Sequence, residues 1–360
     1  MEPFDKILSI SIAAYQVEDT IKKCLDSFLK SKYLHELELL VINDGSKDKT
    51  AEIVSEYERK YPEVIRLVNK ENGGHGSTIN KSLSLARGKF YKILDGDDWV
   101  DVEELDRLID YLKITKAELV LNRCREVFPD YTQVTGNDAG YELEKVYDFA
   151  DLFAEGNVED KLFTLHASTI LTERLRDVNM HILEKCFYAD VMFIYYVGLA
   201  ARTVAFHNSC AYQYRLGAEG QSVSATGIYN HAEDLIKIER HLIKLYQEDS
   251  KKLKDTKKCE YIFAVIDTRY NMLFDWFAGI ITRSDKDQIL FDFIEETNRD
   301  YKDIVNKFHL VPYNRIAAIS PKIFIPIFRL IRNSFLWKIM HDIKAQFRGR
   351  VGTMKVIDEA

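Results

Sequence analysis

Three carboxylates stand close together near residue 95, where Asp95, Asp97 and Asp98 surround Gly96 and follow the apolar run 90–94. An apolar run of this length predicts a strand, so the acids are expected at its carboxyl end. Oxygen ligands of this kind suit a hard divalent cation that keeps positions open for phosphate oxygens. The same tetrapeptide also suits a tight turn before a helix. The cluster therefore predicts either a diphosphate-binding metal site or a turn with a cap.

Two further polar segments follow expected strands. Residues 43–46 read Asn-Asp-Gly-Ser at the end of the apolar run 38–43, and residues 72–76 read Asn-Gly-Gly-His-Gly after the run 64–68. Glycine lets the backbone approach a ligand closely, and a carboxylate such as Asp44 accepts hydrogen bonds from N–H and hydroxyl groups. Ligands of parallel α/β sheets bind outside the carboxyl ends of the strands. These segments and the acidic cluster are therefore expected to line one site.

Apolar periodicity alternates between strand-like and helix-like segments in the first 120 residues. Strands are expected at 7–13, 38–43, 64–68, 90–94 and 118–122, and helices at 20–30, 50–61 and 78–86. This alternation is typical of βαβ units, so the predicted class is α/β, with a Rossmann-like, mainly parallel sheet flanked by helices. Beyond about residue 225 helical patterns dominate, at 229–248, 259–281 and 286–297. We expect two domains, a catalytic one at 1–225 and a helical one at 226–360.

The composition limits the classes of partner. Hydrophobic residues make up 46% and charged residues 30% of the 360 positions, as in globular proteins, and the net charge of −7 argues against general nucleic-acid binding. We find no leader pattern and no run of eighteen apolar residues, so neither a signal peptide nor a spanning helix is expected. The five cysteines lack pairwise spacing. They predict thiols in a reducing cytoplasm.

Five ordered motifs within residues 7–225 resemble the family 2 glycosyltransferases, which are nucleotide-sugar-dependent enzymes of the GT-A fold. The first motif lies at 9–17, and the second, at 41–50, contains Asp-Gly-Ser-Xaa-Asp-Xaa-Thr. In the family these loops hold the nucleoside. The resemblance therefore implies contacts to the uracil base or the ribose from Ala13, Ala14, Tyr15 and Asp44.

The third and fourth motifs are the glycine-rich loop at 72–76 and the acidic signature at 86–99. The third suggests close approach of Gly74 to the nucleotide sugar, whereas His75 is either a contact to phosphate or acceptor or an ordinary surface histidine. For the fourth, the resemblance implies that Asp95, Gly96 and Asp97 face the nucleotide sugar, that Asp97 and Asp98 lie at the metal, and that Asp98 is the best direct ligand.

The fifth motif lies at 187–193, where the family commonly has Glu-Asp and this chain has Ala189 followed by Asp190. The resemblance implies that Asp190 is the catalytic base. An aspartate that begins a helix is otherwise an ordinary cap. Arg215 ends the segment Tyr-Gln-Tyr-Arg and suits the oxygen anions of a diphosphate or acceptor, or has a plain surface role.

The resemblance implies an inverting transfer from a UDP-sugar to a hydroxyl of a glycan, glycoprotein or lipid-linked acceptor, with Mn²⁺ or Mg²⁺ as cofactor. A general base would activate the acceptor hydroxyl, and a cation would stabilise the departing diphosphate. Two alternatives stay open. A nucleotidyltransferase also combines a βαβ sheet with metal-binding acids, and a catalytically silent subunit could bind nucleotide sugar as a scaffold.

The segment 321–350 combines many apolar residues with seven cations and a single acid, Asp342. One interpretation is a helix on an anionic membrane, which would place the protein peripherally at the inner face of the cell membrane. The alternative is packing against the catalytic domain or another subunit, as in a homo-oligomer.

Overall fold

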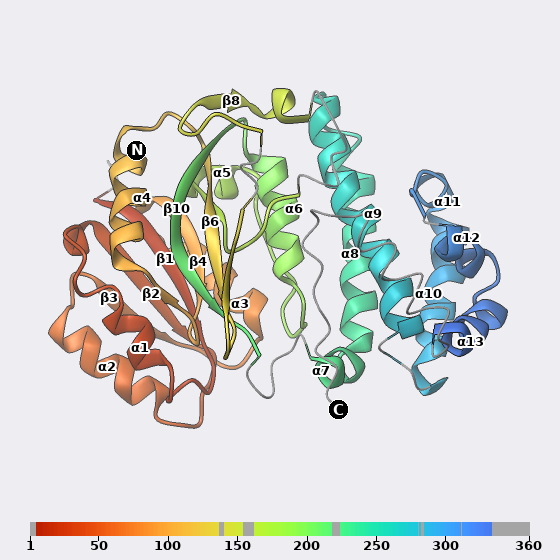
Figure 1. The fold of residues 1–360 in the computed structure, drawn as a ribbon, viewed down its shortest axis with the longest axis horizontal. Coiled ribbons are helices and arrows are strands. Elements are labelled where there is room, and N and C mark those ends of the chain that lie inside the picture. The colour runs from red at the N-terminus through yellow and green to blue at the C-terminus, as the bar shows by residue number, and fades with distance from the viewer. Residues whose placement is uncertain are drawn as a thin grey trace. The chain divides into compact units, whose positions relative to one another are not determined.

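The computed structural model describes residues 5–136, 140–153, 162–217, 224–279, 281, 284–310 and 312–332. The chain divides into two compact units (Figure 1). The first comprises residues 1–157 and 161–218, and the second comprises residues 158–160 and 219–360. The division therefore falls a few residues before the boundary expected from the sequence.

A ten-stranded mixed sheet forms the centre of the first unit, with the main strand order β3-β2-β1-β4-β9-β6-β10-β5, while β7 pairs with β6 and β8 with β10. The strands are β1 (Lys6–Ala14), β2 (Leu37–Asn43), β3 (Ile65–Asn69), β4 (Gly88–Asp95), β5 (Trp99–Val100), β6 (Leu119–Val127), β7 (Thr132–Thr135), β8 (Val146–Asp148), β9 (Ser168–Leu171) and β10 (Thr203–Arg215).

Parallel pairing dominates the sheet. The ladders β1–β2, β1–β4, β2–β3 and β6–β10 are parallel, and each is longer than any of the antiparallel ladders formed by the described strands. The predicted α/β class with a mainly parallel sheet is confirmed. The strand expected at 118–122 is also present as β6, but it pairs with β9 and β10 rather than with β4.

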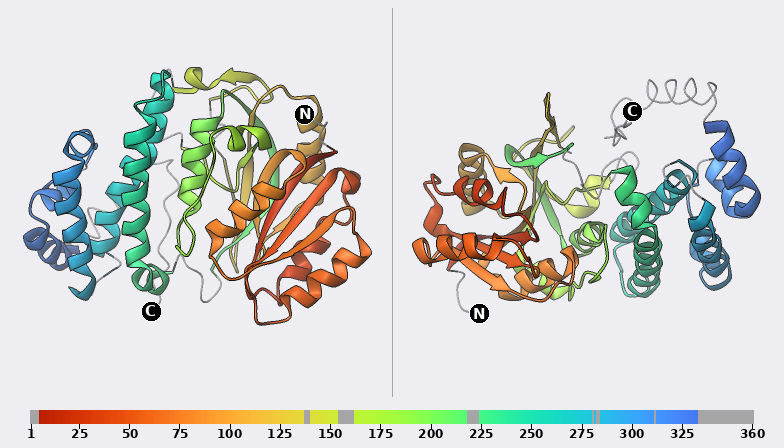
Figure 2. Two further views of the ribbon diagram at one scale, coloured as in Figure 1. Left: turned by 180° about the vertical axis from the view of Figure 1, so that it is seen from behind. Right: turned by 90° about the horizontal axis from the view of Figure 1, so that it is seen from below.

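Helices cover both faces of this sheet (Figures 1 and 2). They are α1 (Ile21–Asp26), α2 (Thr50–Lys60), α3 (His75–Leu85), α4 (Val102–Ile114), α5 (Thr172–Asp177) and α6 (Asp190–Ala200), with short 3₁₀ turns η1 (Leu34–Glu36) and η2 (Phe149–Phe153).

The alternation of side chains along β1 explains the two layers of helices. Leu8, Ile10 and Ile12 lie in one apolar cluster with buried residues of α1, α2 and α4. The intervening Ser11 faces α3, where its hydroxyl lies 2.7 Å from the hydroxyl of Ser82. Burying each large aliphatic side chain stabilises the fold by about 1.5–3 kcal/mol. Helices therefore pack on both faces of the sheet and hold its strands in place.

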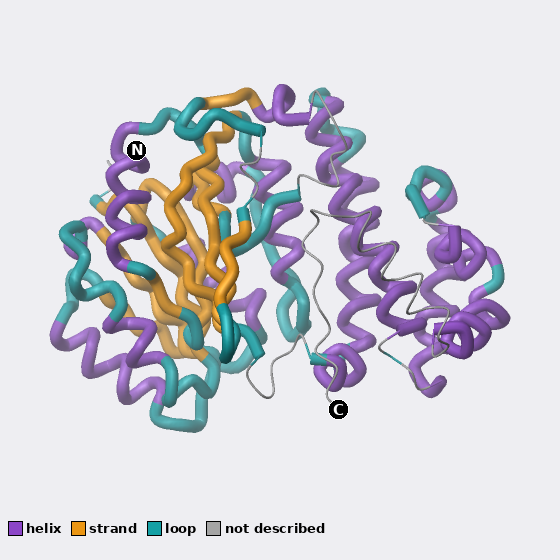
Figure 3. The backbone as a smooth tube through the Cα atoms, in the orientation of Figure 1, coloured by secondary structure: helices purple, strands orange, loops and turns teal. Residues whose placement is uncertain are grey.

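The described secondary structure of the second unit consists of helices joined by loops and turns (Figure 3). Its elements are α7 (Ala225–Asn230), α8 (Ala232–Asp249), α9 (Thr256–Gly279), η4 (Ser284–Lys286), α10 (Asp287–Asp300), α11 (Lys302–Val305), α12 (Pro312–Ile319) and α13 (Pro321–Arg332). The prediction of a helical C-terminal region is confirmed for these residues.

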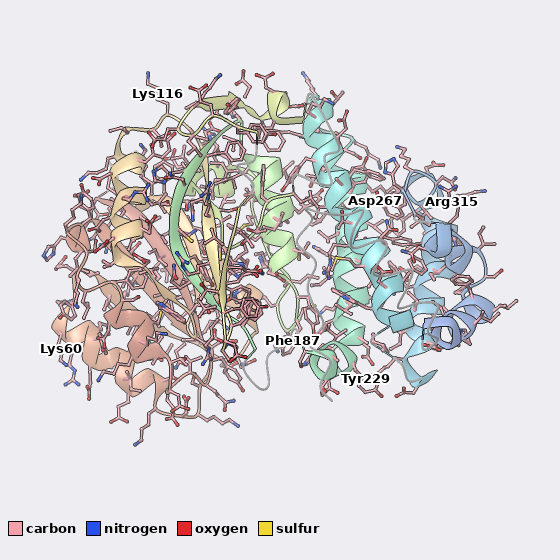
Figure 4. All side chains as sticks on the ribbon, viewed as in Figure 1. Lys60, Lys116, Phe187, Tyr229, Asp267 and Arg315 are labelled. Atoms are coloured by element: carbon pink, nitrogen blue, oxygen red, sulfur yellow. The ribbon has the colours of Figure 1, made fainter. Side chains whose placement is uncertain are left out.

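A buried carboxylate on α9 joins two segments of this second unit. Asp267 on α9, labelled in Figure 4, is buried and accepts hydrogen bonds from the backbone N–H of His309 at 2.9 Å. The His309 ring nitrogen Nδ1 lies 3.0 Å from the same carboxylate. These contacts tie the segment after α11 to α9. No described helix has the length and apolar character needed to cross a bilayer.

Candidate active site

The carboxyl ends of β1, β2, β3 and β4 meet at one edge of the sheet. In the strand registers, Ala13 lies opposite Asp95, Ala14 opposite Asn43, and Asn43 opposite Asn69. Each strand is followed at once by one of the polar segments that the sequence singles out. The expectation that these segments line one edge of the sheet agrees with this geometry, because parallel strands in register must end together.

The first motif contributes one exposed side chain to this edge. Tyr15 is 47% exposed, whereas Ala14 is only 1% exposed and belongs to the apolar core. The carbonyl oxygen of Ala14 accepts from the N–H of Asp44 at 2.9 Å, and that of Ala13 accepts from the N–H of Gly96 at 2.9 Å. Tyr15 can therefore reach a ligand, while the two alanines mainly join adjacent loops. The implied base contacts of Ala13, Ala14 and Tyr15 stay predictions, and for the buried Ala14 such a contact would come from the backbone.

Asp44 is buried at 2% exposure, and its carboxylate holds the glycine-rich loop. It accepts from the N–H groups of Gly73 at 2.9 Å and Gly74 at 2.8 Å, and from the ammonium of Lys70 at 2.6 Å. The implied contact of Asp44 to a base or ribose stays a prediction, and Oδ2, which accepts from Gly74, has a second lone pair for it. Asp44 also fixes the loop that leads into α3.

The conformation of that loop depends on Gly74, which has φ +78° as the N-cap of α3. A side chain is strained in this region, so glycine is required. The expected approach of the Gly74 backbone to a ligand is limited, because its N–H already donates to Asp44. Gly73 accepts from the N–H of Lys185 at 2.5 Å, so the loop before α6 rests on the glycine-rich loop.

The same loop before α6 packs on the start of α3. Any Cβ at Gly76 would clash with the carbonyl oxygen of Leu183. Asn80 donates to the carbonyl of Ile182 at 2.8 Å and accepts from its N–H at 2.9 Å. Phe187, labelled in Figure 4, lies further along this loop and is 45% exposed. These contacts carry the chain to the first residue of α6.

That first residue is Asp190, and its side chain is exposed. The N-cap of α6 is Ala189, which makes no side-chain capping bond. Asp190 is therefore not the cap, although an acid in a first helical turn is favourable beside the helix dipole. Ala189 is buried, so no second acid stands where the family commonly has one. Asp190 thus presents a carboxylate that no capping bond consumes.

The acidic signature divides into two different environments. Asp98 is 2% exposed; its Oδ2 accepts from the hydroxyl of Tyr212 at 2.7 Å and its Oδ1 from the N–H of Arg215 at 2.7 Å. Asp97 is 32% exposed at its side chain and lies 3.4 Å from the Arg215 guanidinium. That Asp98 is the best direct metal ligand stays a prediction, because each of its oxygens accepts one hydrogen bond here and keeps a second lone pair. Asp97 presents the accessible carboxylate.

Burial and mutual repulsion shift the pKa values of these acids. Burial raises the pKa of Asp98 to about 8, and the charges of Asp95 and Asp97 reinforce the shift. Burial and the charge of Asp95 also raise the pKa of Asp97. For Asp95, burial acts in the same direction, but the charge of His75 and its contact outweigh burial and lower the pKa. Crowded carboxylates of this kind favour a nearby cation.

These residues could hold a divalent ion if a bound diphosphate supplied further oxygen ligands. Among the described residues, no group of three His, Cys, Asp or Glu side chains could hold a metal. Asp97, with Asp95 two residues before it, supplies hard oxygen donors of the type that Mg²⁺ and Mn²⁺ use when phosphate oxygens complete the coordination. The donor set therefore fits an ion shared between the chain and a bound diphosphate.

His75 contacts the acidic signature directly. Its Nε2 lies 3.1 Å from Oδ1 of Asp95, and both side chains are 30% exposed. Of the two interpretations from the sequence, the ordinary surface histidine is corrected by this contact. No signal in the sequence pairs positions 75 and 95, because the contact depends on how α3 starts beside the end of β4.

Sequence reasoning also missed a buried layer behind the acids. Lys92 on β4 is 2% exposed, and its ammonium donates to the carbonyl of His166 at 2.7 Å. The His166 ring stacks on Tyr214 with centroids 4.2 Å apart and meets Tyr212 edge-on at 4.7 Å. A lysine in the middle of an otherwise apolar strand was the available signal for this layer.

Tyr214 lies within electrostatic reach of four carboxylates. Burial raises the pKa of its phenol, and the charges of Asp95, Asp98, Asp190 and Asp97 raise it further, in that order. Burial lowers the pKa of the neighbouring His166 to about 4, with the charges of Asp95 and Asp190 opposing it. The structure therefore brings Asp190 close to the acidic signature, although the two are far apart in the sequence.

Comparisons with known proteins show which family this chain resembles. The family profile described as Glycosyl transferase family 2 matches residues 9–165. The uncharacterized glycosyltransferase EpsJ of Bacillus subtilis is 32% identical over 114 residues, which cover 32% of this chain and 33% of EpsJ. The chondroitin synthase of Pasteurella multocida is 34% identical over 125 residues, covering 34% of this chain and 13% of the synthase. The chain spans at most 60% of the length of the first curated relatives it matches.

A solved structure resembles the whole chain. The crystal structure of residues 1–349 of TarS from S. aureus, in complex with UDP-GlcNAc, has a TM-score of 0.65 and covers 92% of both chains. The sequence identity is 16%, so this likeness concerns the fold. It extends over the mixed sheet and over the helical C-terminal region.

Proposed function

Because the chain belongs to glycosyltransferase family 2 and has the GT-A fold, we propose that it transfers a sugar from a UDP-sugar to an acceptor hydroxyl with inversion at the anomeric carbon. The observation that carries this proposal is that the start of α3 contacts both acidic segments: Nε2 of His75 lies 3.1 Å from Oδ1 of Asp95, and the Gly73 carbonyl accepts from the N–H of Lys185 on the loop before Asp190. These contacts support a site that contains acids from two distant segments. Such a pair of acidic groups can serve the two ends of a displacement.

Asp190 is the proposed general base. Its carboxylate is exposed at the start of α6, on a loop that the glycine-rich loop supports, so an acceptor hydroxyl can approach it. Removing the proton from that hydroxyl makes its oxygen a competent nucleophile, and a positioned base typically contributes about 10²–10⁴-fold to the rate. Attack from the side opposite the departing diphosphate inverts the anomeric centre.

The leaving diphosphate is proposed to lie beside Asp97 and Arg215. The guanidinium of Arg215 lies 3.4 Å from Asp97 and offers planar donors that suit phosphate oxygens. Asp97, with Asp95, would hold a divalent ion when one is bound, and that ion would neutralise charge on the departing phosphate oxygens. Asp98 positions this segment, because it ties the signature to Tyr212 and to the backbone of Arg215.

The UDP donor and the acceptor class are supported by the relatives. TarS, which shares the fold, has been solved with UDP-GlcNAc, and chondroitin synthase, which shares part of the sequence, is named for a glycan product. We propose a UDP-hexose or UDP-N-acetylhexosamine as donor. A glycan, glycoprotein or lipid-linked hydroxyl is the proposed acceptor.

Turnover of a donor panel tests this function. UDP-glucose, UDP-galactose and their N-acetylated counterparts would each be incubated with the protein and Mn²⁺, and released UDP would be measured with and without a mixture of glycan acceptors. We expect UDP release from one donor that increases with acceptor. Pyrophosphate formed from UTP and a sugar 1-phosphate would point to a nucleotidyltransferase instead. UDP-sugar binding without any turnover would point to a silent scaffold.

We also propose that the C-terminal segment contacts an anionic lipid surface at the inner face of the cell membrane. On α13, Ile323 is 66% and Ile327 is 46% exposed, one helical turn apart. The remaining cations that motivated this prediction, at 338–350, lie outside the described residues. Exposed apolar side chains with flanking cations suit such a surface.

Sedimentation with phosphatidylserine vesicles tests this contact in the full chain. The comparison variant carries Lys338→Gln, Lys344→Gln, Arg348→Gln and Arg350→Gln. We expect the unchanged protein to sediment with the vesicles and the variant to stay largely in the supernatant. Equal sedimentation would remove the membrane proposal, and a concentration-dependent dimer would favour a second copy of the chain as the occupant.

A further inference from the structure

His75 and Asp95 form a pair, and backbone hydrogen bonds hold the chain at or beside both positions. His75 is the first residue of α3, directly after Gly74, whose N–H is anchored by the carboxylate of Asp44. Asp95 is the last residue of β4, and its N–H donates to the hydroxyl of Tyr212 at 3.2 Å. These bonds hold the backbone at both positions, and Nε2 of His75 lies 3.1 Å from Oδ1 of Asp95.

The pair remains open to a ligand although its contact atom is covered. Nε2 of His75 is buried, yet both side chains keep 30% of their surface exposed. The contact joins Nε2 to Oδ1 and so leaves Nδ1 of the ring and Oδ2 of the carboxylate outside it. A carboxylate oxygen and an imidazole edge side by side can each bond a hydroxyl group.

The contacts of positions 74 and 75 place His75 between the two halves of the site. Its Nε2 lies 3.1 Å from Oδ1 of Asp95 in the acidic signature. A Cβ built on the adjacent Gly74 would meet the backbone of Lys185 and Cys186 at 3.5 Å, on the loop that leads to the proposed base. The group that must pass between a departing diphosphate and an attacking hydroxyl is the transferred sugar.

We propose that His75 contacts the hydroxyl groups of the transferred sugar together with Asp95, and so helps to select the donor. This inference rests on the proposed function and adds a specificity residue to it. The chemical class that the pair recognises is a neutral vicinal diol, rather than the diphosphate or the uracil. The nucleoside and phosphates of the donor are consequently expected to bind almost independently of His75.

Binding titrations that compare UDP with the UDP-sugar turned over fastest test this inference. They would be performed on the full chain as unchanged protein, His75→Ala and His75→Gln. His35, exposed within the 3₁₀ turn η1, provides the matched control His35→Gln. We expect His75→Ala to weaken the UDP-sugar about tenfold, as for the loss of about 1.4 kcal/mol, while UDP affinity stays within twofold. His75→Gln should recover part of the loss, and His35→Gln should change neither affinity.

Asp95→Asn and the double variant with His75→Ala add a second readout. If the two side chains bind the same sugar, the fold-loss of UDP-sugar affinity in the double variant should be smaller than the product of the fold-losses in the two single variants. An unchanged ratio of UDP-sugar to UDP affinity in His75→Ala would overturn the inference. Equal weakening of UDP would also overturn it, because His75 would then serve the nucleotide or the fold. Failure of the unchanged protein to turn over any UDP-sugar would instead count against the proposed function.

Discussion

Replacement of Lys92 with methionine should remove a specific pH dependence of stability. Lys92 is 2% exposed on β4, and burial lowers its pKa to about 7 from the ordinary value of 10.5. Between these two values the unfolded chain binds a proton that the folded chain does not. The free energy of unfolding must therefore rise with pH across this window and stay level below it.

The size of the effect follows from the width of the window. Each pH unit within it contributes at most about 1.4 kcal/mol, so the interval from about pH 7.5 to 9.5 contributes roughly 2–3 kcal/mol. In the folded chain His166 and Cys124 stay neutral across this interval, because burial lowers the pKa of His166 to about 4 and raises that of the Cys124 thiol. Asp98, with a pKa of about 8, titrates in the interval in both proteins, so its contribution drops out of the difference between them.

Urea unfolding in buffers across this interval measures the effect. The comparison is between the unchanged protein, Lys92→Met and the exposed control Lys81→Met. Loss of the bond to the His166 carbonyl adds an offset to Lys92→Met that does not depend on pH. We expect the difference in unfolding free energy between unchanged protein and Lys92→Met to grow by about 2–3 kcal/mol with pH. A constant difference would refute the reasoning, because it would mean that folded Lys92 stays charged.

Three further predictions concern the loop, the acids and the ion. Gly76→Ala should destabilise the fold by about 1–3 kcal/mol and lower kcat, because the added Cβ displaces the Leu183 carbonyl on the loop before Asp190. Urea unfolding and turnover assays measure the two effects. Wild-type values for both would contradict this prediction. Tyr212→Phe should lower the free energy of unfolding by about 1–2 kcal/mol, because Asp98 loses a hydroxyl donor at 2.7 Å. A melting temperature equal to that of the unchanged protein would contradict this loss of stability. Chelation with EDTA should abolish sugar transfer until Mn²⁺ or Mg²⁺ is restored, and full activity in EDTA would exclude the proposed ion.

The parts of the fold that depend on local sequence patterns were predictable. The strands β1 to β4 appear close to their expected positions, because apolar periodicity and parallel pairing reinforce each other there. The helix expected at 78–86 begins earlier, at His75, since Gly74 caps it and Asp44 holds the loop. The second half of the sheet was less predictable. Its strands β9 and β10 pair across long separations, and sequence periodicity carries no information about such partners.

The candidate site shows a similar division. The sequence identified the acids that converge, because the motif spacing marks the ends of consecutive strands. It did not separate acids that face a ligand from acids that support the structure. Asp44 and Asp98 are predicted ligand contacts, and in the structure their carboxylates also accept hydrogen bonds from loop N–H groups, Lys70, Tyr212 and the backbone of Arg215. That distinction depends on which donors surround a buried carboxylate, and only the tertiary structure determines it.

The most direct test of the proposed chemistry is the turnover of Asp190→Asn. Its matched control is Asp177→Asn, an exposed carboxylate at the end of α5 that pairs with Arg174. We predict that Asp190→Asn lowers kcat for UDP-sugar transfer by at least roughly 100-fold while the Kd for UDP stays within twofold, and that Asp177→Asn changes neither. Retention of most of the transfer activity by Asp190→Asn would contradict the assignment of this aspartate as the base.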